Sequence, residues 1–275
     1  MQSRVLIFYH SASGNTSWIA MKLADIFKVY GSEVDVHNII HQPAAIDFSH
    51  YDLIGFGCPV MGFRPSFALT NFIDSLPPQH AIPAFIFTTY SGILANAPWM
   101  LTHRLRRQGF VIVGHKHFRS EVSWPIIRAV GLISNHGKPD EQSLSHVEHY
   151  VQHLSRVMKE LHAERTLPAV QIPFALFNPF SYLALVNTPG KLRMIMGKKL
   201  IDEKKCTQCG CCGTYCAVKA ITLNPYPTFD EKCTGCWGCF NVCPEGAINT
   251  IVGLKARYRT KVSTLMSQEA VYNLP

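Results

Sequence analysis

Two runs of four cysteines share one spacing in this sequence of 275 residues. Each run reads C-x2-C-x2-C-x3-C, and every cysteine of the second run lies 27 positions after its counterpart in the first. The cysteines are Cys206, Cys209, Cys212, Cys216, Cys233, Cys236, Cys239 and Cys243. The repeat extends past them, because Ala220 and Ile221 return as Ala247 and Ile248. The pattern therefore predicts a duplicated metal-binding unit.

The spacing suits iron–sulfur cubes, in which each of four iron corners takes one thiolate. Three closely spaced cysteines can wrap three corners from one loop, and the fourth then ligates the other cube. The predicted sets are crossed: Cys206, Cys209, Cys212 and Cys243 hold one cluster, and Cys216, Cys233, Cys236 and Cys239 hold the other. Zinc sites favour C-x2-C pairs separated by a longer loop, so this spacing does not suit zinc. Disulfides are rare without a secretory signal.

Residues 199–252 resemble the bacterial ferredoxins that hold two [4Fe-4S] clusters. Pro244 follows the last cysteine as in that family, whereas Ala217 stands where the family has a first proline. Cys211 is an additional cysteine beside Cys212. The register of the repeat leaves Cys211 outside both ligand sets, so we expect it to be a free or buried thiol.

The N-terminal third begins with a pattern of strand, small-residue loop and helix. Arg4–Tyr9 is an apolar run typical of a buried parallel strand, and Ser17–Tyr30 has helical periodicity. The loop between them, residues 10–16, lacks the lysine of ATP-binding loops and the glycine pattern of dinucleotide sites. Its hydroxyls and the N–H groups at the helix start could hold a phosphate. The plainer interpretation is an ordinary strand–helix turn. The S-x-S-G-N-T pattern resembles the flavodoxin loop that binds the FMN phosphate.

The remaining pattern predicts a doubly wound α/β fold. Further strands are expected at Glu33–His37, Asp52–Gly57, Pro83–Thr88 and Phe110–Phe118. Alternation with helices gives a five-stranded parallel sheet of flavodoxin-like order 2-1-3-4-5. The loops after the first, third and fourth strands then meet at one edge of the sheet, where such folds bind ligands.

The resemblance to short-chain flavodoxins implies FMN at these three loops. The loop Cys58–Phe63 would contact the flavin ring, with the Met61 carbonyl facing the reduced ring nitrogen. Residues 89–97 would contact its pyrimidine edge. The expected FMN residues are Ser11, Ala12, Ser13, Gly14, Asn15, Thr16, Pro59, Val60, Met61, Gly62, Thr89, Tyr90, Ser91, Gly92 and Asn96. The sequence leaves open whether Tyr90 stacks on the outer ring face, and Cys58 is expected to be a buried thiol.

The expected organisation is a flavodoxin-like domain (1–165), a linker strap (166–199), a small α+β ferredoxin-like domain (200–252) and a tail (253–275). Four prolines in the strap exclude a long helix there. Residues 119–139 form either a flap near the flavin loops or a segment packed between the domains. The basic tail either wraps back onto the first domain or docks a partner.

The charge and composition of the sequence bear on which partners and which location are expected. The formal charge is +8, with most of the excess after residue 165. Bound clusters and a flavin phosphate would offset much of that charge, and no base-reading motif is present, so nucleic acid is not expected as a partner. The longest apolar stretch, residues 174–186, is interrupted by Asn178 and Pro179, so no membrane span is expected. The N-terminus shows no secretory signal, and we expect a reducing cytoplasm.

The whole chain resembles the flavodoxin–ferredoxin fusion proteins. This resemblance implies an electron-transfer protein with FMN and two [4Fe-4S] clusters, served by low-potential redox protein partners. One alternative is a flavin-dependent reductase of a small-molecule acceptor, fed by the clusters. Another is a flavin-free sensor or partner-binding module. No acid–base constellation is evident, so no catalytic residue is assigned.

Overall fold

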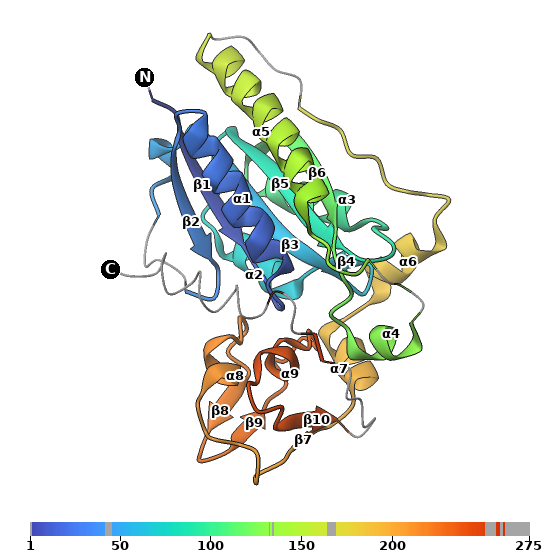
Figure 1. Cartoon of the computed structure of the whole chain (residues 1–275). Helices are drawn as coiled ribbons and strands as arrows, with labels where there is room; N and C mark the ends of the chain where they lie inside the picture. Colours follow the sequence, from blue (N-terminus) through green and yellow to red (C-terminus); the bar gives the residue numbers. More distant parts are fainter. Residues whose placement is uncertain are drawn as a thin grey trace.

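The computed structural model describes residues 2–41, 46–131, 133, 135–163, 169–250, 257–258 and 261. A large α/β region is followed by a smaller cysteine-rich region, which lies beneath the C-terminal ends of the parallel strands (Figure 1). Among the described residues, no helix is long and apolar enough to cross a membrane. Most of the expected tail lies outside the described residues.

Five parallel strands form the large sheet. In sheet order they are β2 (Glu33–Asn38), β1 (Arg4–Tyr9), β3 (Leu53–Met61), β5 (Ile82–Tyr90) and β6 (Phe110–Arg119). The predicted fold class and strand order are thereby confirmed, with one addition: the short β4 (Arg64–Pro65) pairs antiparallel with the end of β3.

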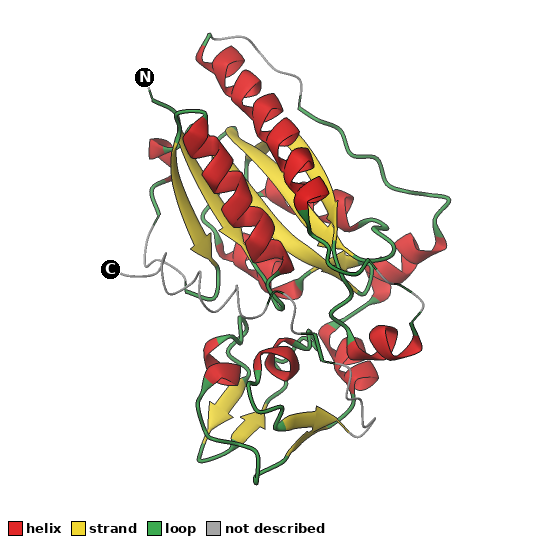
Figure 2. Cartoon of the chain, in the orientation of Figure 1, coloured by secondary structure: helices red, strands yellow, loops and turns green. Residues whose placement is uncertain are grey.

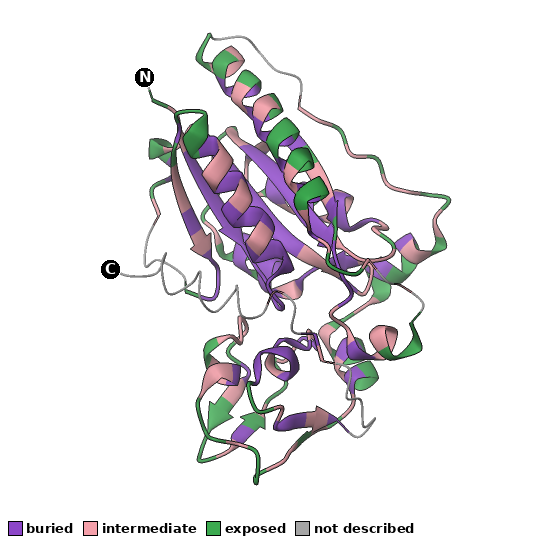
Figure 3. Ribbon diagram, in the orientation of Figure 1, coloured by how far each residue is buried: buried purple, intermediate pink, exposed green. Residues whose placement is uncertain are grey.

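Helices cover both faces of this sheet (Figure 2). On one face lie α1 (Asn15–Val29) and α5 (Glu141–His162); on the other lie α2 (Phe67–Ser75), α3 (Ala97–Arg107) and the 3-10 turn η1 (Phe48–His50). Strand β1 shows why the central strands are apolar throughout: Val5 and Ile7 pack toward α1, while Leu6 and Phe8 pack toward α2. Figure 3 shows the resulting buried sheet between helices whose outer sides are exposed.

The third strand is longer than the sequence predicts. It continues through the expected ring loop to Met61, because Met61 pairs with Arg64 in a tight hairpin. Gly62 and Phe63 form the turn with φ of 57° and 67°. Two consecutive residues with positive φ are typical of the turn that best joins antiparallel strands.

The strap, defined here as residues 169–198, contains two helices of eight residues, α6 (Pro179–Val186) and α7 (Pro189–Met196). Each begins at a proline, which is favoured at the first helical position because its missing N–H has no intrahelical acceptor there. Asn178 and Thr188 cap the two helices through their side chains. The prolines therefore divide the strap into short helices, as expected.

Residues 119–139 contain the short helix α4 (Pro125–Val130). Trp124 and Ile126 pack against Met196 of α7 and against Trp237 and Phe240 of the cysteine-rich region. This segment therefore lies between the two regions, and it also walls the cleft described below. The two placements that the sequence left open both apply.

The cysteine-rich region preserves the sequence repeat in its backbone. It contains β7 (Lys199–Ile201), α8 (Cys211–Thr214), β8 (Ile221–Leu223), β9 (Pro227–Phe229), α9 (Gly238–Val242) and β10 (Ile248–Thr250). Strand β7 pairs with β10 and β9 pairs with β8, all antiparallel. Positive φ angles recur at the repeat interval, as in Gln208 and Gly235 or in Gly210 and Trp237.

Polar contacts tie the two regions together. The Asn241 side chain donates to the Ser123 carbonyl at 3.1 Å. It also accepts from the backbone N–H of Tyr258 at 3.0 Å. The Tyr258 hydroxyl in turn donates to Asn15 Oδ1 at the start of α1 at 2.6 Å. At this residue the tail wraps back onto the first region, which is one of the two placements that the sequence left open.

The close approach of β3 to β5 yields a stability prediction. Gly57 is paired with Phe87, and a Cβ at Gly57 would lie 2.0 Å from Phe87 Cζ. Gly57→Ala should therefore overpack the core and lower the free energy of unfolding by about 1–3 kcal/mol. Urea unfolding of the purified holoprotein, followed by circular dichroism, measures this change.

The matched control is Gly190→Ala in α7, where the nearest atoms to an added Cβ lie 3.8 Å away. This change should alter the unfolding free energy by no more than about 1 kcal/mol, with the better helix propensity of alanine in its favour. Equal destabilisation by both substitutions would contradict the packing argument.

Candidate functional site

A cleft of about 390 Å³ lies at the C-terminal ends of β1, β3 and β5. Its size falls within the roughly 300–1,000 Å³ typical of small-molecule sites. Most of the residues predicted to bind FMN line it: Ala12, Ser13, Asn15, Pro59, Val60, Met61, Gly62, Thr89, Tyr90, Ser91 and Gly92. The three loops that the sequence singled out therefore meet at one place, because parallel strands end at one edge of the sheet.

Four predicted FMN residues do not line the cleft. Ser11, Gly14 and Thr16 belong to the first loop but are not part of the cleft lining. Ser11 Oγ accepts from the Gly14 N–H at 3.1 Å, and the Thr16 and Thr89 hydroxyls lie 2.8 Å apart. Asn96 is buried beside the strap instead, and its Oδ1 accepts from the Ala175 N–H at 2.8 Å. Its side chain fixes the strap to the start of α3.

The residues that close the cleft from the other side are not among the predicted FMN residues, although the sequence left open that residues 119–139 form a flap there. They are Phe63, Ile93, Ser120, Glu121, Val122, Ser123, Trp124, Ile127, Ile133 and Phe180. Most belong to residues 119–139, whose apolar run was the available signal. Phe180 comes from α6 of the strap, and its ring lies 4.7 Å from that of Phe63. Tyr90 does line the cleft, with the Arg119 guanidinium 4.8 Å from its ring centre.

A buried carboxylate anchors this closing segment. Glu121 accepts from Arg128 Nη1 at 2.6 Å and from the Gly137 N–H at 3.2 Å. Its backbone carbonyl accepts from Asn15 Nδ2 at 3.2 Å. Because Asn15 also accepts from Tyr258, one side chain connects the first loop, the closing segment and the tail.

The strap also fixes the ring loop. Asn187 Nδ2 donates to the Gly62 carbonyl at 2.7 Å. Arg64, buried under the loop, donates to the Asn187 carbonyl at 2.6 Å. Burial of this guanidinium lowers the pKa of Arg64 to about 10. The hairpin at the cleft is therefore positioned by a segment 125 residues further along the chain.

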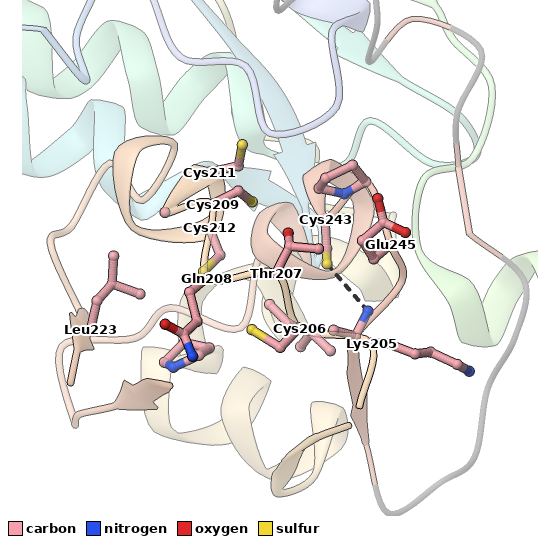
Figure 4. Close-up of a pocket in the computed structure, with 15 residues that line it drawn as sticks. Lys205, Cys206, Thr207, Gln208, Cys209, Cys211, Cys212, Leu223, Cys243 and Glu245 are labelled. Atoms are coloured by element: carbon pink, nitrogen blue, oxygen red, sulfur yellow. Dashed lines mark hydrogen bonds between the residues drawn. The ribbon is translucent and has the colours of Figure 1, made fainter. Parts of the chain in front are cut away.

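The cysteines gather around two separate pockets. Cys206, Cys209, Cys212 and Cys243 line the first, together with Cys211 and with other residues between 205 and 248 only. Figure 4 shows these five side chains, with the Cys211 sulfur pointing away from those of Cys206 and Cys243. The fourth cysteine of the second run thus lies with the first three of the first run.

The second pocket is lined by Cys216, Cys233, Cys236 and Cys239. It also includes His10 and Ala68 from the large α/β region, so it lies at the boundary between the two regions. His10 is buried, and no described residue accepts from or donates to its Nδ1. Trp237, which is 1% exposed, forms part of the same wall.

Thiol chemistry and backbone donors suit a negatively charged cluster in both pockets. Burial raises the pKa of Cys212 and of Cys236 to about 11, and that of Cys239 well above its usual value. Deprotonating such thiols requires a metal partner to stabilise the thiolates. Backbone N–H groups also reach the sulfurs at equivalent repeat positions: Ala220 donates to Cys216 at 3.3 Å and Ala247 to Cys243 at 3.2 Å.

The other two cysteines differ in their surroundings. Cys58 is fully buried, and burial raises its pKa to about 12, in keeping with the expected buried thiol. Burial also raises the pKa of Cys211. Among the described residues, no three His, Cys, Asp or Glu side chains converge on the position of a single metal ion.

A lysine lies close to one sulfur of the second cysteine set. Lys199 Nζ lies 3.2 Å from Cys233 Sγ and 4.6 Å from the centre of the Phe229 ring. At the repeat interval, Lys199 corresponds to Tyr226, so the first pocket has an uncharged residue at the equivalent position. The electrostatic environments of the two cysteine sets therefore differ.

The second pocket and the cleft share a wall. A Cβ added to Gly238 would lie 3.4 Å from Cys236 Sγ, 3.6 Å from the Ala12 carbonyl oxygen and 3.8 Å from Ala12 Cβ. Ala12 lines the cleft, and Cys236 lines the second pocket. The backbone at Gly238 therefore lies between the second cysteine set and the loop predicted to bind the FMN phosphate, close to both.

Comparison with known families agrees with this division. The flavodoxin domain family matches residues 6–99, and the 4Fe-4S binding domain family matches residues 226–249. The chain thus carries a flavodoxin domain at its N-terminus and a 4Fe-4S binding domain at its C-terminus, consistent with a flavodoxin–ferredoxin fusion. The second match contains only the second run of cysteines. No curated protein matches the sequence.

Solved structures resemble the N-terminal part. A flavodoxin from the domain Archaea is 14% identical, with 57% of this chain and 99% of that chain covered and a TM-score of 0.42. Flavodoxin 1 from Bacillus cereus is 18% identical, with coverage of 56% and 98% and a TM-score of 0.42. A flavodiiron core from Synechocystis is 19% identical, with a TM-score of 0.43, covering 58% of this chain but only 36% of its own.

Proposed function

We propose that this fusion of a flavodoxin domain and a ferredoxin-type domain is an electron-transfer protein, in which two [4Fe-4S] clusters and one FMN form a single relay. The proximity of the second cysteine pocket to the loop after β1 carries the proposal: His10 lines that pocket, and a Cβ added to Gly238 would lie within 3.8 Å of both Cys236 Sγ and Ala12. It brings the wall of the second cysteine pocket against the wall of the cleft. Electrons could then pass between a cluster and a flavin without crossing solvent.

The residues fit the two kinds of group. The cleft offers small residues, hydroxyls and backbone N–H groups at a helix start, which suit the phosphate of FMN. Each cysteine pocket contains the four thiols of one predicted crossed set, and the first pocket contains Cys211 in addition. When bound, the clusters supply one-electron steps and the flavin can hold one or two electrons. The chain's own residues set the spacing and the surrounding charge.

The relay has an inner and an outer end. The pocket of Cys216, Cys233, Cys236 and Cys239 contacts the flavodoxin domain through His10 and Ala68. The pocket of Cys206, Cys209, Cys212 and Cys243 is lined by the cysteine-rich region alone, and Cys209 is exposed. We therefore assign the pocket of Cys206, Cys209, Cys212 and Cys243 as the port for a redox protein partner. The pocket of Cys216, Cys233, Cys236 and Cys239 is assigned as the step next to the flavin.

A reductase is the second candidate. Trp124, Ile127 and Ile133 of residues 119–139 close the cleft together with Phe180. A walled cleft suits a small-molecule acceptor better than an open flavin edge does, because it can exclude water from the reacting atoms. Rapid oxidation of the reduced protein by small acceptors, in preference to protein acceptors, would favour this candidate.

The cofactor content tests the relay directly. Anaerobic purification followed by analysis of iron, acid-labile sulfide and flavin should give about eight iron, about eight sulfide and one FMN per chain. Stopped-flow reduction by a low-potential donor should then reduce the clusters before the flavin. Failure to retain FMN after reconstitution would leave the partner-binding module as the better interpretation.

The crossed ligand sets are tested by replacing a single cysteine. In Cys216→Ala, the thiols of Cys233, Cys236 and Cys239 should become open to alkylation. The thiols of Cys206, Cys209 and Cys212 should stay protected. Mass spectrometry of the alkylated protein identifies the modified residues, and iron should fall to about half. Cys211→Ser is the control and should leave the iron content unchanged. Exposure of the first run instead would refute the crossed assignment.

The charge at Lys199 should raise the reduction potential of the inner cluster. Reduction adds negative charge, which the ammonium group 3.2 Å from Cys233 Sγ stabilises. Loss of about 1 kcal/mol of this interaction in Lys199→Met would lower that potential by roughly 40 mV for a one-electron couple. A redox titration followed by electron paramagnetic resonance measures both clusters.

Two variants serve as controls for this electrostatic effect. Lys199→Arg keeps the charge and should keep most of the potential. Lys205→Met removes an exposed cation that lines the outer pocket and forms an ion pair with Asp202 at 3.4 Å, so its effect should be smaller. Equal shifts of both clusters in Lys199→Met would show that the lysine does not act on one cluster selectively.

A further inference from the structure

The strap concentrates exposed apolar side chains. Large exposed apolar residues in a span of 20 positions are Leu176, Phe177, Tyr182, Leu183, Leu185, Val186, Met194 and Ile195. Phe177 is 100% exposed and Met194 is 76% exposed. Single exposed apolar residues are ordinary, but a gathering of this size on one segment marks an interaction surface.

These side chains are not part of the core of the described chain. In α6, Ser181 and Ala184 face inward and are buried, while the apolar residues at 182, 183, 185 and 186 face outward. In α7, Leu192 and Met196 are buried, and the outward side carries Met194 and Ile195. Each short helix therefore has an inner side that attaches it to the protein and a second, outward apolar side.

The charges of the strap have one sign. Residues 166–201 contain no aspartate or glutamate and four cations, Lys191, Arg193, Lys198 and Lys199. Arg193 donates to the Cys233 carbonyl at 2.9 Å and Lys199 lies against its sulfur, so both serve the inner pocket. Lys191 and Lys198 are exposed beside the outward apolar residues of α7.

We propose that the outward faces of α6 and α7 bind an anionic lipid surface, as short interfacial helices lying on the membrane rather than crossing it. Such helices insert apolar and aromatic side chains at the headgroup boundary and place lysines toward anionic lipids. A carboxylate-free segment avoids repulsion from those lipids. The full exposure of Phe177 suits insertion into a lipid layer, where a protein partner would need a matching pocket.

This surface lies next to the cleft. Phe180, on the same helix as the exposed residues, lines the cleft and packs against Phe63 of the ring loop. Figure 1 shows α6 and α7 in succession along one side of the molecule, with α4 beside them. Lipid binding would hold the cleft near the membrane surface. The inference does not depend on which cofactors are bound.

Co-sedimentation of the holoprotein with lipid vesicles tests the proposal. Wild-type protein should sediment with vesicles of phosphatidylcholine and phosphatidylglycerol, and much less with phosphatidylcholine alone. The double variant Phe177→Ser/Leu183→Ser should bind at least about tenfold more weakly, because two inserted apolar side chains are lost. Lys191→Gln/Lys198→Gln should weaken binding to the anionic vesicles by about fivefold or more for each lysine and should reduce its salt dependence.

Val29→Ser is the matched control, since Val29 is 82% exposed but lies on α1 away from the strap. It should bind as wild type. An unchanged visible absorption spectrum verifies that each variant retains its cofactors, so a loss of lipid binding is distinct from a failure of the proposed relay. Absence of wild-type binding to anionic vesicles would overturn the proposal. So would a concentration-dependent dimer that Phe177→Ser/Leu183→Ser abolishes, because the patch would then be an interface between two copies.

Discussion

The close approach of α9 to the loop after β1 joins the two regions. A Cβ added to Gly238 would lie 3.4 Å from Cys236 Sγ and 3.6 Å from the Ala12 carbonyl oxygen, which are ordinary van der Waals distances, so the α9 backbone runs close to that loop. This approach places one cysteine pocket at the boundary and leaves the other facing outward. In the proposed relay the order of the centres follows from this arrangement, because electron transfer is faster between centres that lie closer together.

The strap determines how rigidly this contact is held. Its two helices are short, and each begins at a proline. The side chains of Asn178 and Thr188 cap them. Asn187 holds the Gly62 carbonyl and accepts from Arg64, while Arg193 reaches the backbone of the inner cysteine loop. The same segment therefore positions the ring loop and one cysteine pocket. A free linker would allow the two regions to separate, whereas this one joins them through partly buried hydrogen bonds.

The two halves of the cysteine repeat have diverged where they meet different surroundings. Gly210 and Trp237 occupy equivalent positions with positive φ, a conformation that glycine adopts at little cost and tryptophan does not. Trp237 adopts it at the boundary, where its ring is buried against Met196 and Phe240, and this burial offsets the backbone strain. Lys199 and Tyr226 also occupy equivalent positions of the repeat and carry different side chains. The two equivalent halves of the repeat thus have different surroundings, one at the boundary and one facing outward.

The sequence by itself determined the features that depend on local spacing. The cysteine interval predicted crossed ligand sets, because the fourth cysteine of such a run ligates the other cube, and the pockets group the cysteines in the same combination. The alternation of apolar runs and helices predicted the sheet order, and with it the meeting of three loops. The sequence left open whether residues 119–139 reach the cleft. Tertiary structure decided that Glu121 and Trp124 of this segment line it, and that Phe180 of the strap joins them. It also placed Asn96, a predicted FMN residue, beside the strap and not in the cleft. These placements depend on contacts between residues far apart in the chain, and such contacts leave no periodic signal in the sequence.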